Sequence, residues 1–232
     1  MHRTARSECW PGNFFARFFY FGQFFYLEHK SYSFITHVMD EQEIEIDALV
    51  EYPTLVAVSR FTKLIPRTDW FRYVGEPLDG EVQQKARAYL DALGFPEATP
   101  AQVDDWQEAG HTLETNDWNS SFWEVEQQLM AALTIEVTDN IDPQLLEMVL
   151  ANVTSVASEY VGEGVLIAAD RWDMEDEDLM KAAIGEGVQA CYQAALVIAA
   201  GVDDDHPFKL KYQLFETGWW PLGVMGTTFN IF

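Results

Sequence analysis

The sequence predicts a mainly α-helical protein, a single bundle of six or seven helices that ends in a small C-terminal β-hairpin. Apolar residues recur three and four positions apart through most of residues 39–232, as they do on the buried face of a helix. Near the C-terminus they instead alternate around Gly226, which favours a hairpin. Capping residues followed by proline, which favour helix starts, occur at Thr99-Pro100, Asp142-Pro143 and Asp205-His206-Pro207.

Two helices are predicted between residues 53 and 94. The first runs as far as Pro66, although its β-branched residues leave a strand as the alternative. The second follows a turn-forming loop and ends at Gly94, because glycine readily adopts the left-handed conformation of a helix C-cap. The residues predicted to face inward are Leu55, Val58, Phe61, Leu64 and Ile65 in the first helix, and Val82, Ala86, Tyr89, Leu90 and Leu93 in the second.

Two further helices are predicted before residue 141. Thr99-Pro100 starts one of them, which places Val103, Trp106 and Leu113 on its inner side. A capping box formed by Ser121 and Glu124 starts the other, which ends at Asp139-Asn140. The residues of this second helix that are predicted to face inward are Phe122, Val125, Leu129, Leu133 and Val137.

The stretch from Asp142 to Gly201 is predicted to form the centre of the bundle. Its first helix keeps apolar residues at helical spacing as far as Gly162, which can end it. The short apolar run 164–169 fits either a strand or a helical turn. A longer helix begins behind a run of acidic residues, which the helix dipole favours at an N-terminus. Its apolar face is rich in alanine and contains Gly185 and Gly187, so neighbouring helices can approach it closely.

The chain is predicted to end with a helix and the hairpin. The helix carries Phe208, Tyr212 and Phe215 on one face. Adjacent residues of a strand point to opposite sides, so one of Trp219 and Trp220 is expected to be buried and the other at least partly exposed. An exposed tryptophan is a candidate anchor for a partner protein. The alternative is that the pair covers the end of the helical core.

Residues 1–38 differ from the globular domain predicted for residues 39–232. Half of the sixteen phenylalanines lie in this extension, and the sequence becomes acidic immediately after Met39. Arg17 and Gln23 interrupt the apolar run, which is too short for a membrane span and lacks the features of a secretory signal. The remaining interpretations are a loosely attached or disordered segment, an aromatic helix at a membrane interface, and a mis-annotated start with translation beginning at Met39.

The chain is strongly acidic. Its 38 Asp and Glu against 14 Lys and Arg give a formal net charge of −24. This balance disfavours binding to nucleic acids and to anionic lipids, both of which attract basic residues. It is compatible with a solvated surface, with a face for a basic partner, or with carboxylate metal ligands. Two cysteines, Cys9 and Cys191, are too few for a disulfide framework, which favours a cytoplasmic location.

A metal site is one candidate for the chemistry of this chain. Glu108 and His111 stand three positions apart on a predicted helix and could share a metal ion with Glu114. Carboxylate-bridged metal sites in helical bundles use such a motif twice, and here it occurs once, although Glu124, Glu126 and Glu147 could complete a site. Surface carboxylates beside a half-exposed histidine are the alternative interpretation, and no cofactor is predicted.

A basic cluster is the other candidate. Four of the ten basic residues after Met39 fall within thirteen positions, and they could bind an anionic group of a ligand. They could also pair with neighbouring carboxylates, as surface charges commonly do. The four residues are Arg60, Lys63, Arg67 and Arg72.

No catalytic residues are identified. The sequence has no nucleophile elbow, phosphate-binding loop, dinucleotide fingerprint or zinc-ligand spacing. We therefore expect a protein-interaction module of the inhibitor or immunity type that acts on a basic partner. The alternatives are a metal enzyme that uses carboxylates with His111, and a protein that binds a small anion through the basic cluster.

Overall fold

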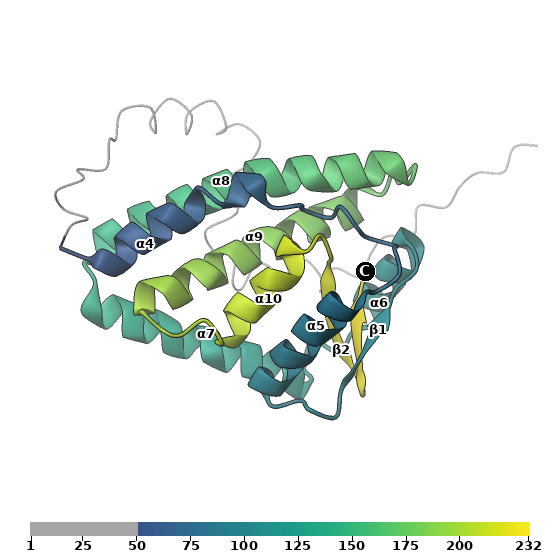
Figure 1. The fold of residues 1–232 in the computed structure, drawn as a ribbon, viewed down its shortest axis with the longest axis horizontal. Helices are drawn as coiled ribbons and strands as arrows, with labels where there is room; N and C mark the ends of the chain where they lie inside the picture. The colour runs from purple at the N-terminus through teal and green to yellow at the C-terminus, as the bar shows by residue number, and fades with distance from the viewer. Residues whose placement is uncertain (1–50) are drawn as a thin grey trace, which may run out of the picture. The chain divides into compact units, whose positions relative to one another are not determined.

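The computed structural model describes residues 51–232, which contain seven α-helices, one short 3-10 helix and a three-stranded sheet (Figure 1). The expectations for residues 1–38 lie outside the described residues. The predicted mainly α-helical fold with a C-terminal hairpin is confirmed. The elements are α4 (Pro53–Thr62), η1 (Ile65–Arg67), α5 (Gly80–Leu93), β1 (Thr99–Gln102), α6 (Trp106–Thr115), α7 (Ser121–Asn140), α8 (Pro143–Arg171), α9 (Glu177–Ala200), α10 (Pro207–Glu216), β2 (Pro221–Met225) and β3 (Thr228–Ile231).

Helix α9 is the central helix of the bundle and contacts α4, α7, α8 and α10. It is long and apolar enough to cross a membrane, but 72% of its apolar window is buried inside the protein, as is typical of a core helix. Gly187 faces α8, and a Cβ atom at this position would lie 2.6 Å from Val161 Cγ1. The missing side chain therefore lets α8 and α9 pack closely, as predicted.

Helices α5 and α10 follow the sequence predictions most closely. All five residues predicted to face inward from α5 are buried, and Gly94 ends the helix with a φ of 85°. In α10, Phe208, Tyr212 and Phe215 are buried, and the His206 side chain caps the helix. Helix α4 is confirmed over its strand alternative, but it ends at Thr62. Leu64 lies beyond that end and is 48% exposed.

Helix α8 is longer than predicted. It continues through Gly162 and over the apolar run 164–169 as one helix of 29 residues. Gly164 is a packing position, because a Cβ atom there would lie 2.5 Å from Trp70 Cβ. The glycines in this segment therefore do not end the helix, and Gly164 lets α8 approach the connection between α4 and α5.

The sheet at one end of the bundle contains a strand that the sequence did not predict (Figure 1). Strands β2 and β3 form the expected antiparallel hairpin, and β1 pairs in parallel with β3, with Thr99 opposite Thr228. Thr99-Pro100 thus opens a strand, and the predicted helix starts later, at Trp106, where Asp105 caps it. Four residues with a distant partner carry too little periodicity to be recognised as a strand.

Trp219 and Trp220 are both buried, with 3% and 0% of their surface exposed. The prediction that one of them is exposed is therefore wrong, and neither can anchor a partner as a surface side chain. The backbone of Trp220 exchanges two hydrogen bonds with that of Phe232, which holds the C-terminus against the sheet. The indole ring of Trp220 contacts the indole ring of Trp106 and the phenyl ring of Phe71. Their burial agrees with the alternative interpretation, in which the two tryptophans cover the end of the helical core.

Candidate functional site

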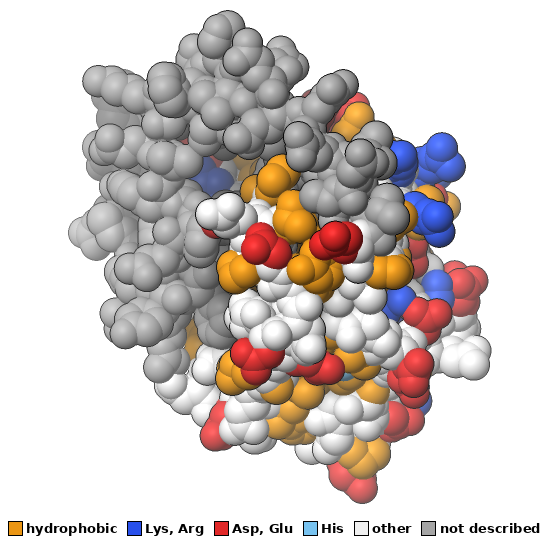
Figure 2. Space-filling view, turned by 90° about the vertical axis from the view of Figure 1, so that its left-hand side faces the viewer, with side chains coloured by type: hydrophobic (Ala, Val, Ile, Leu, Met, Phe, Trp, Pro, Cys, Tyr) orange, Lys and Arg blue, Asp and Glu red, His pale blue; other side chains and the backbone are white. Residues whose placement is uncertain are grey.

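The carboxylates of the described residues lie almost entirely at the surface. Residues 51–232 contain 31 Asp and Glu, of which 28 are exposed, one is half-buried and two, Glu126 and Glu186, are buried. Of the ten Lys and Arg in the same range, Lys211 alone is buried. Figure 2 shows Asp and Glu side chains spread over one face, with Lys and Arg gathered at its edge. Residues 51–232 thus present a predominantly negative surface above a core that holds three charged residues.

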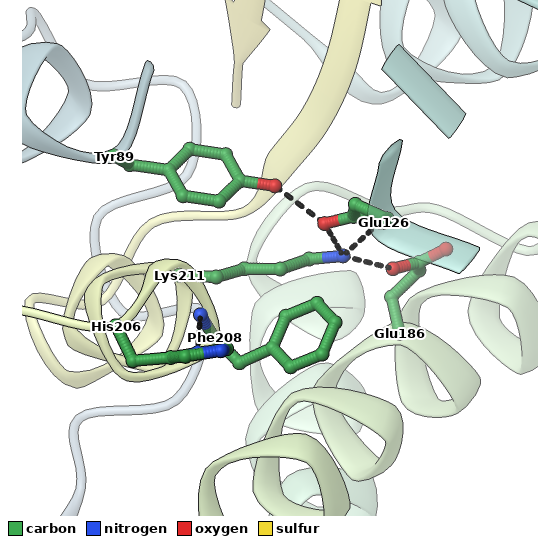
Figure 3. Close-up of polar contacts among 6 residues, drawn as sticks. All are labelled: Tyr89, Glu126, Glu186, His206, Phe208 and Lys211. Atoms are coloured by element: carbon green, nitrogen blue, oxygen red, sulfur yellow. Dashed lines mark hydrogen bonds and ion pairs between the residues drawn. The ribbon is translucent and has the colours of Figure 1, made fainter. Parts of the chain in front are cut away.

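These three buried charges lie together, one on each of three helices (Figure 3). Lys211 Nζ on α10 donates to both carboxylate oxygens of Glu126 on α7, at 3.1 and 3.2 Å. The same nitrogen lies 3.7 Å from Glu186 Oε2 on α9. Tyr89 on α5 donates its hydroxyl hydrogen to Glu126 Oε1 at 2.5 Å. The buried cluster of Tyr89, Glu126, Glu186 and Lys211 therefore joins four helices by polar contacts.

Burial and mutual charge set the protonation of the buried cluster. Burial raises the pKa of the Glu186 carboxyl, an effect that Lys211 opposes and the neighbouring Glu126 reinforces. Burial also raises the pKa of Tyr89 well above its usual value, so the phenol keeps the hydrogen that it donates. Burial lowers the pKa of the Lys211 ammonium, but the two glutamates outweigh this effect and raise it overall. The ammonium is therefore charged and compensated within the protein.

Sequence reasoning missed the buried cluster, although a signal for it exists. Glu126 falls between Phe122 and Met130 at helical spacing, on the side of α7 that is buried. Glu186 likewise lies among the buried residues of α9, and Lys211 among those of α10. A charged residue inside an apolar stripe needs a partner of opposite charge, because an unpaired buried charge is unstable. Val125 and Leu129, predicted to face inward, are half-buried instead.

A cleft of about 650 Å³ opens at the surface beside the start of α5 and the end of α10. We call it the acidic cleft, because five carboxylates and two guanidinium groups line it. Tyr73 and Trp219 supply aromatic walls. The five carboxylates are those of Asp69, Glu76, Asp79, Glu81 and Glu216, and the two guanidinium groups are those of Arg72 and Arg171.

Both arginines of the acidic cleft already have partners within the protein. Arg72 Nη1 donates to Asp69 Oδ1 at 2.8 Å, and its guanidinium lies over the Tyr73 ring, 5.5 Å from the centroid. Arg171 Nη1 donates to the backbone carbonyl of Arg72 at 2.6 Å. Because these guanidinium groups are engaged and outnumbered, the cleft is negative in balance.

Two carboxylates of the acidic cleft remain available to a ligand. Asp79 caps α5, and Glu81 pairs with Lys85 at 3.0 Å. The carboxylates of Glu76 and Glu216 accept no hydrogen bond from another residue in the range 51–232. Partial burial raises the pKa of Glu216, although Lys85 and Lys209 pull it down. A cation that entered the cleft would meet these two groups.

The predicted basic cluster is divided by the structure. Arg72 lines the acidic cleft, whereas Arg60, Lys63 and Arg67 are exposed on and after α4 and do not line it. Arg72 pairs with Asp69, and the other three form no ion pair with any of residues 51–232. The structure thus does not bring the four cationic groups together around this cavity.

The predicted metal ligands are not assembled into a site. Among residues 51–232, no group of three His, Cys, Asp or Glu side chains is placed to hold a metal ion. Glu108, His111 and Glu114 are all exposed along α6. Glu108 instead accepts a hydrogen bond from the backbone N–H of Asp104, while Asp105 accepts one from that of Glu108. The two bonds satisfy backbone N–H groups just before and within the first turn of α6, which explains an acidic residue at position 108.

The remaining titratable candidates have structural roles. Cys191 is buried, and burial raises the pKa of its thiol well above the usual range, so the reactive thiolate is disfavoured. His206 Nδ1 accepts the backbone N–H of Phe208 at 3.1 Å and caps α10, as the sequence indicated (Figure 3). Burial lowers the pKa of His206, which keeps this nitrogen free to accept.

No protein-family model, no curated protein and no solved structure matches this chain, so its function has to be inferred from its own residues.

Proposed function

We propose that this protein is an interaction module of the inhibitor or immunity type, which binds a basic partner protein and receives a Lys or Arg side chain of that partner in the acidic cleft. The charge balance of the cleft carries the proposal. Five carboxylates face two guanidinium groups that are already bonded within the protein. Complementary charge across an interface accelerates association and selects between partners.

The walls of the acidic cleft also suit a cationic side chain. Tyr73, which is 40% exposed, already holds the Arg72 guanidinium over its ring, and an entering cation can contact the part of the ring that Arg72 leaves open. The volume of about 650 Å³ exceeds that of one side chain, so a whole Lys or Arg side chain fits inside. The surface of residues 51–232, whose 28 exposed carboxylates include those of the cleft, would steer a basic protein toward it over long distances.

The alternatives have less support. Arg60, Lys63 and Arg67 do not line the acidic cleft, so they do not join Arg72 there around a small anion. A metal enzyme would need converging ligands, which residues 51–232 do not supply. An acidic interaction surface, in contrast, requires only carboxylates, which the chain has in excess over basic residues.

The proposal is tested by calorimetric titration with the peptide acetyl-Gly-Arg-Gly-Ser-Gly-amide. We expect binding at low salt that weakens steeply at about 0.5 M salt, because salt screens the interaction of exposed charges. The double variant Glu76→Gln/Glu216→Gln should weaken binding about tenfold, or ~1.4 kcal/mol. Glu136→Gln/Glu147→Gln is the matched control, since it removes two exposed carboxylates that do not line the cleft.

Two results would reject the proposal. One is the absence of any binding at low salt, which would contradict the claim that the protein binds a basic partner. The other is an equal loss of affinity in the two double variants, which would mean that the peptide responds to the net charge of the chain and not to the cleft.

A further inference from the structure

A second cavity adjoins the acidic cleft. This groove of about 390 Å³ lies between the connection that follows α4 and the C-terminal half of α8. Asp69, Arg72 and Arg171 line both cavities, so the cleft and the groove are neighbours that share these three side chains. A segment of a few residues that occupies one cavity can therefore reach the other.

The groove differs from the acidic cleft in charge. It is lined by two carboxylates, Asp69 and Glu163, and by the two guanidinium groups of Arg72 and Arg171, so its formal charges cancel. In the cleft, five carboxylates against the same two arginines leave three negative charges in excess. A cation is therefore favoured in the cleft and has no such preference for the groove.

The groove is also partly apolar and open to solvent. Ile167 lines it and is 63% exposed, and Trp70 and Ala168 form part of its wall. Leu166, the neighbour of Ile167 on α8, is 59% exposed. Large exposed apolar side chains beside a groove favour contact with an apolar group, because burying them removes their surface from water.

We infer that the cleft and the groove together form one recognition site for a segment of the basic partner in which a Lys or Arg side chain lies beside an aromatic or large aliphatic side chain. The cation occupies the acidic cleft, and the apolar side chain covers Ile167 in the groove. This inference rests on the proposed function and specifies which part of a basic partner is recognised. A second copy of this chain is a poor occupant, because it carries the same formal charge of −24.

The inference is tested with two peptides that differ at one position. Acetyl-Gly-Arg-Gly-Phe-Gly-amide offers both groups, and acetyl-Gly-Arg-Gly-Ser-Gly-amide offers the cation alone. We expect the protein to bind the phenylalanine peptide about tenfold more tightly by calorimetry, because the ring covers part of the groove. Ile167→Ser should abolish this preference. Ile135→Ser should retain it, since Ile135 is 62% exposed on α7 and does not line the groove.

The outcomes separate this inference from the proposed function. If both peptides bind equally and the Glu76→Gln/Glu216→Gln variant weakens both, the proposed function of the acidic cleft is retained and the inference about the groove is rejected. Loss of the preference in Ile135→Ser as well as in Ile167→Ser also rejects the groove. If neither peptide binds, the proposed function fails first. Self-association that Ile167→Ser abolishes and Ile135→Ser retains would place a second copy in the groove and overturn the inference.

Discussion

The buried cluster around Lys211 and the acidic cleft are built from the same types of residue, but they differ in their contact with water. Lys211, Glu126 and Glu186 are 3%, 5% and 7% exposed, so each charge depends on its neighbours in the protein for compensation. In the cleft, Glu76 and Glu216 are exposed, so water can solvate their carboxylates without a partner in the protein. Burial, and not residue type, thus separates the carboxylates that hold the fold together from those that are free to meet a ligand.

Removal of the buried ammonium should have the largest effect on stability. Lys211→Met leaves Glu126 and Glu186 without a cation, and breaking a buried ion pair on one side destabilises a protein by ~3–5 kcal/mol. We expect a loss of this order in the free energy of unfolding, measured by urea titration. Lys209→Met removes an ammonium of the same helix that pairs with exposed Asp204, so its loss should stay below about 1 kcal/mol. Equal losses of unfolding free energy in the two variants would contradict the distinction between the buried and the exposed ammonium group.

The second effect is a pH dependence that originates in the buried cluster. The folded protein holds a proton on Glu186 to higher pH than the unfolded chain does, because its pKa is raised above the ordinary 4.5. The stability that this carboxyl contributes is therefore greatest below pH 4.5 and is lost as the pH rises through the raised value. We expect Glu186→Gln to remove this loss, seen as a flatter dependence of the melting temperature on pH. A wild-type profile parallel to that of the variant would contradict it.

The smallest effect on stability is expected in the acidic cleft. Glu76→Gln and Glu216→Gln change exposed carboxylates without a hydrogen-bonding partner among residues 51–232, so unfolding free energies should change by less than about 0.5 kcal/mol. The pKa of Glu216 is also raised by partial burial, which makes a slight stabilisation the expected sign at neutral pH. A loss comparable to that of Lys211→Met, measured in the same urea titration, would mean that these residues support the fold.

Local signals in the sequence were sufficient for most helices. The spacing of Val82, Ala86 and Tyr89 identified the buried face of α5, and Gly94 identified its end. These features succeed because a helix is stabilised by residues three and four positions apart and by caps within one turn. The alanine-rich face around Gly187 likewise indicated a central helix, since close packing depends on the size of each side chain along it.

Local signals failed where a residue depends on a distant partner. Gly162 looked like the end of a helix, but α8 continues through it and packs Gly164 closely against Trp70. Thr99-Pro100 looked like a helix start, but β3 supplies a strand partner for it. The acidic cleft also could not be predicted from the sequence, because its lining comes from segments as far apart in the chain as Asp69 and Trp219.

The sequence alone therefore determined the class of fold, most of its helices and the excess of negative charge, because these depend on composition and on neighbours within one or two turns. The tertiary structure decided which charges are buried. It placed Lys211 between Glu126 and Glu186, buried both C-terminal tryptophans and left Glu76 and Glu216 open to water. The physical reason is that the free energy of a charge depends on what surrounds it in space, and those surroundings exist only once the helices have packed.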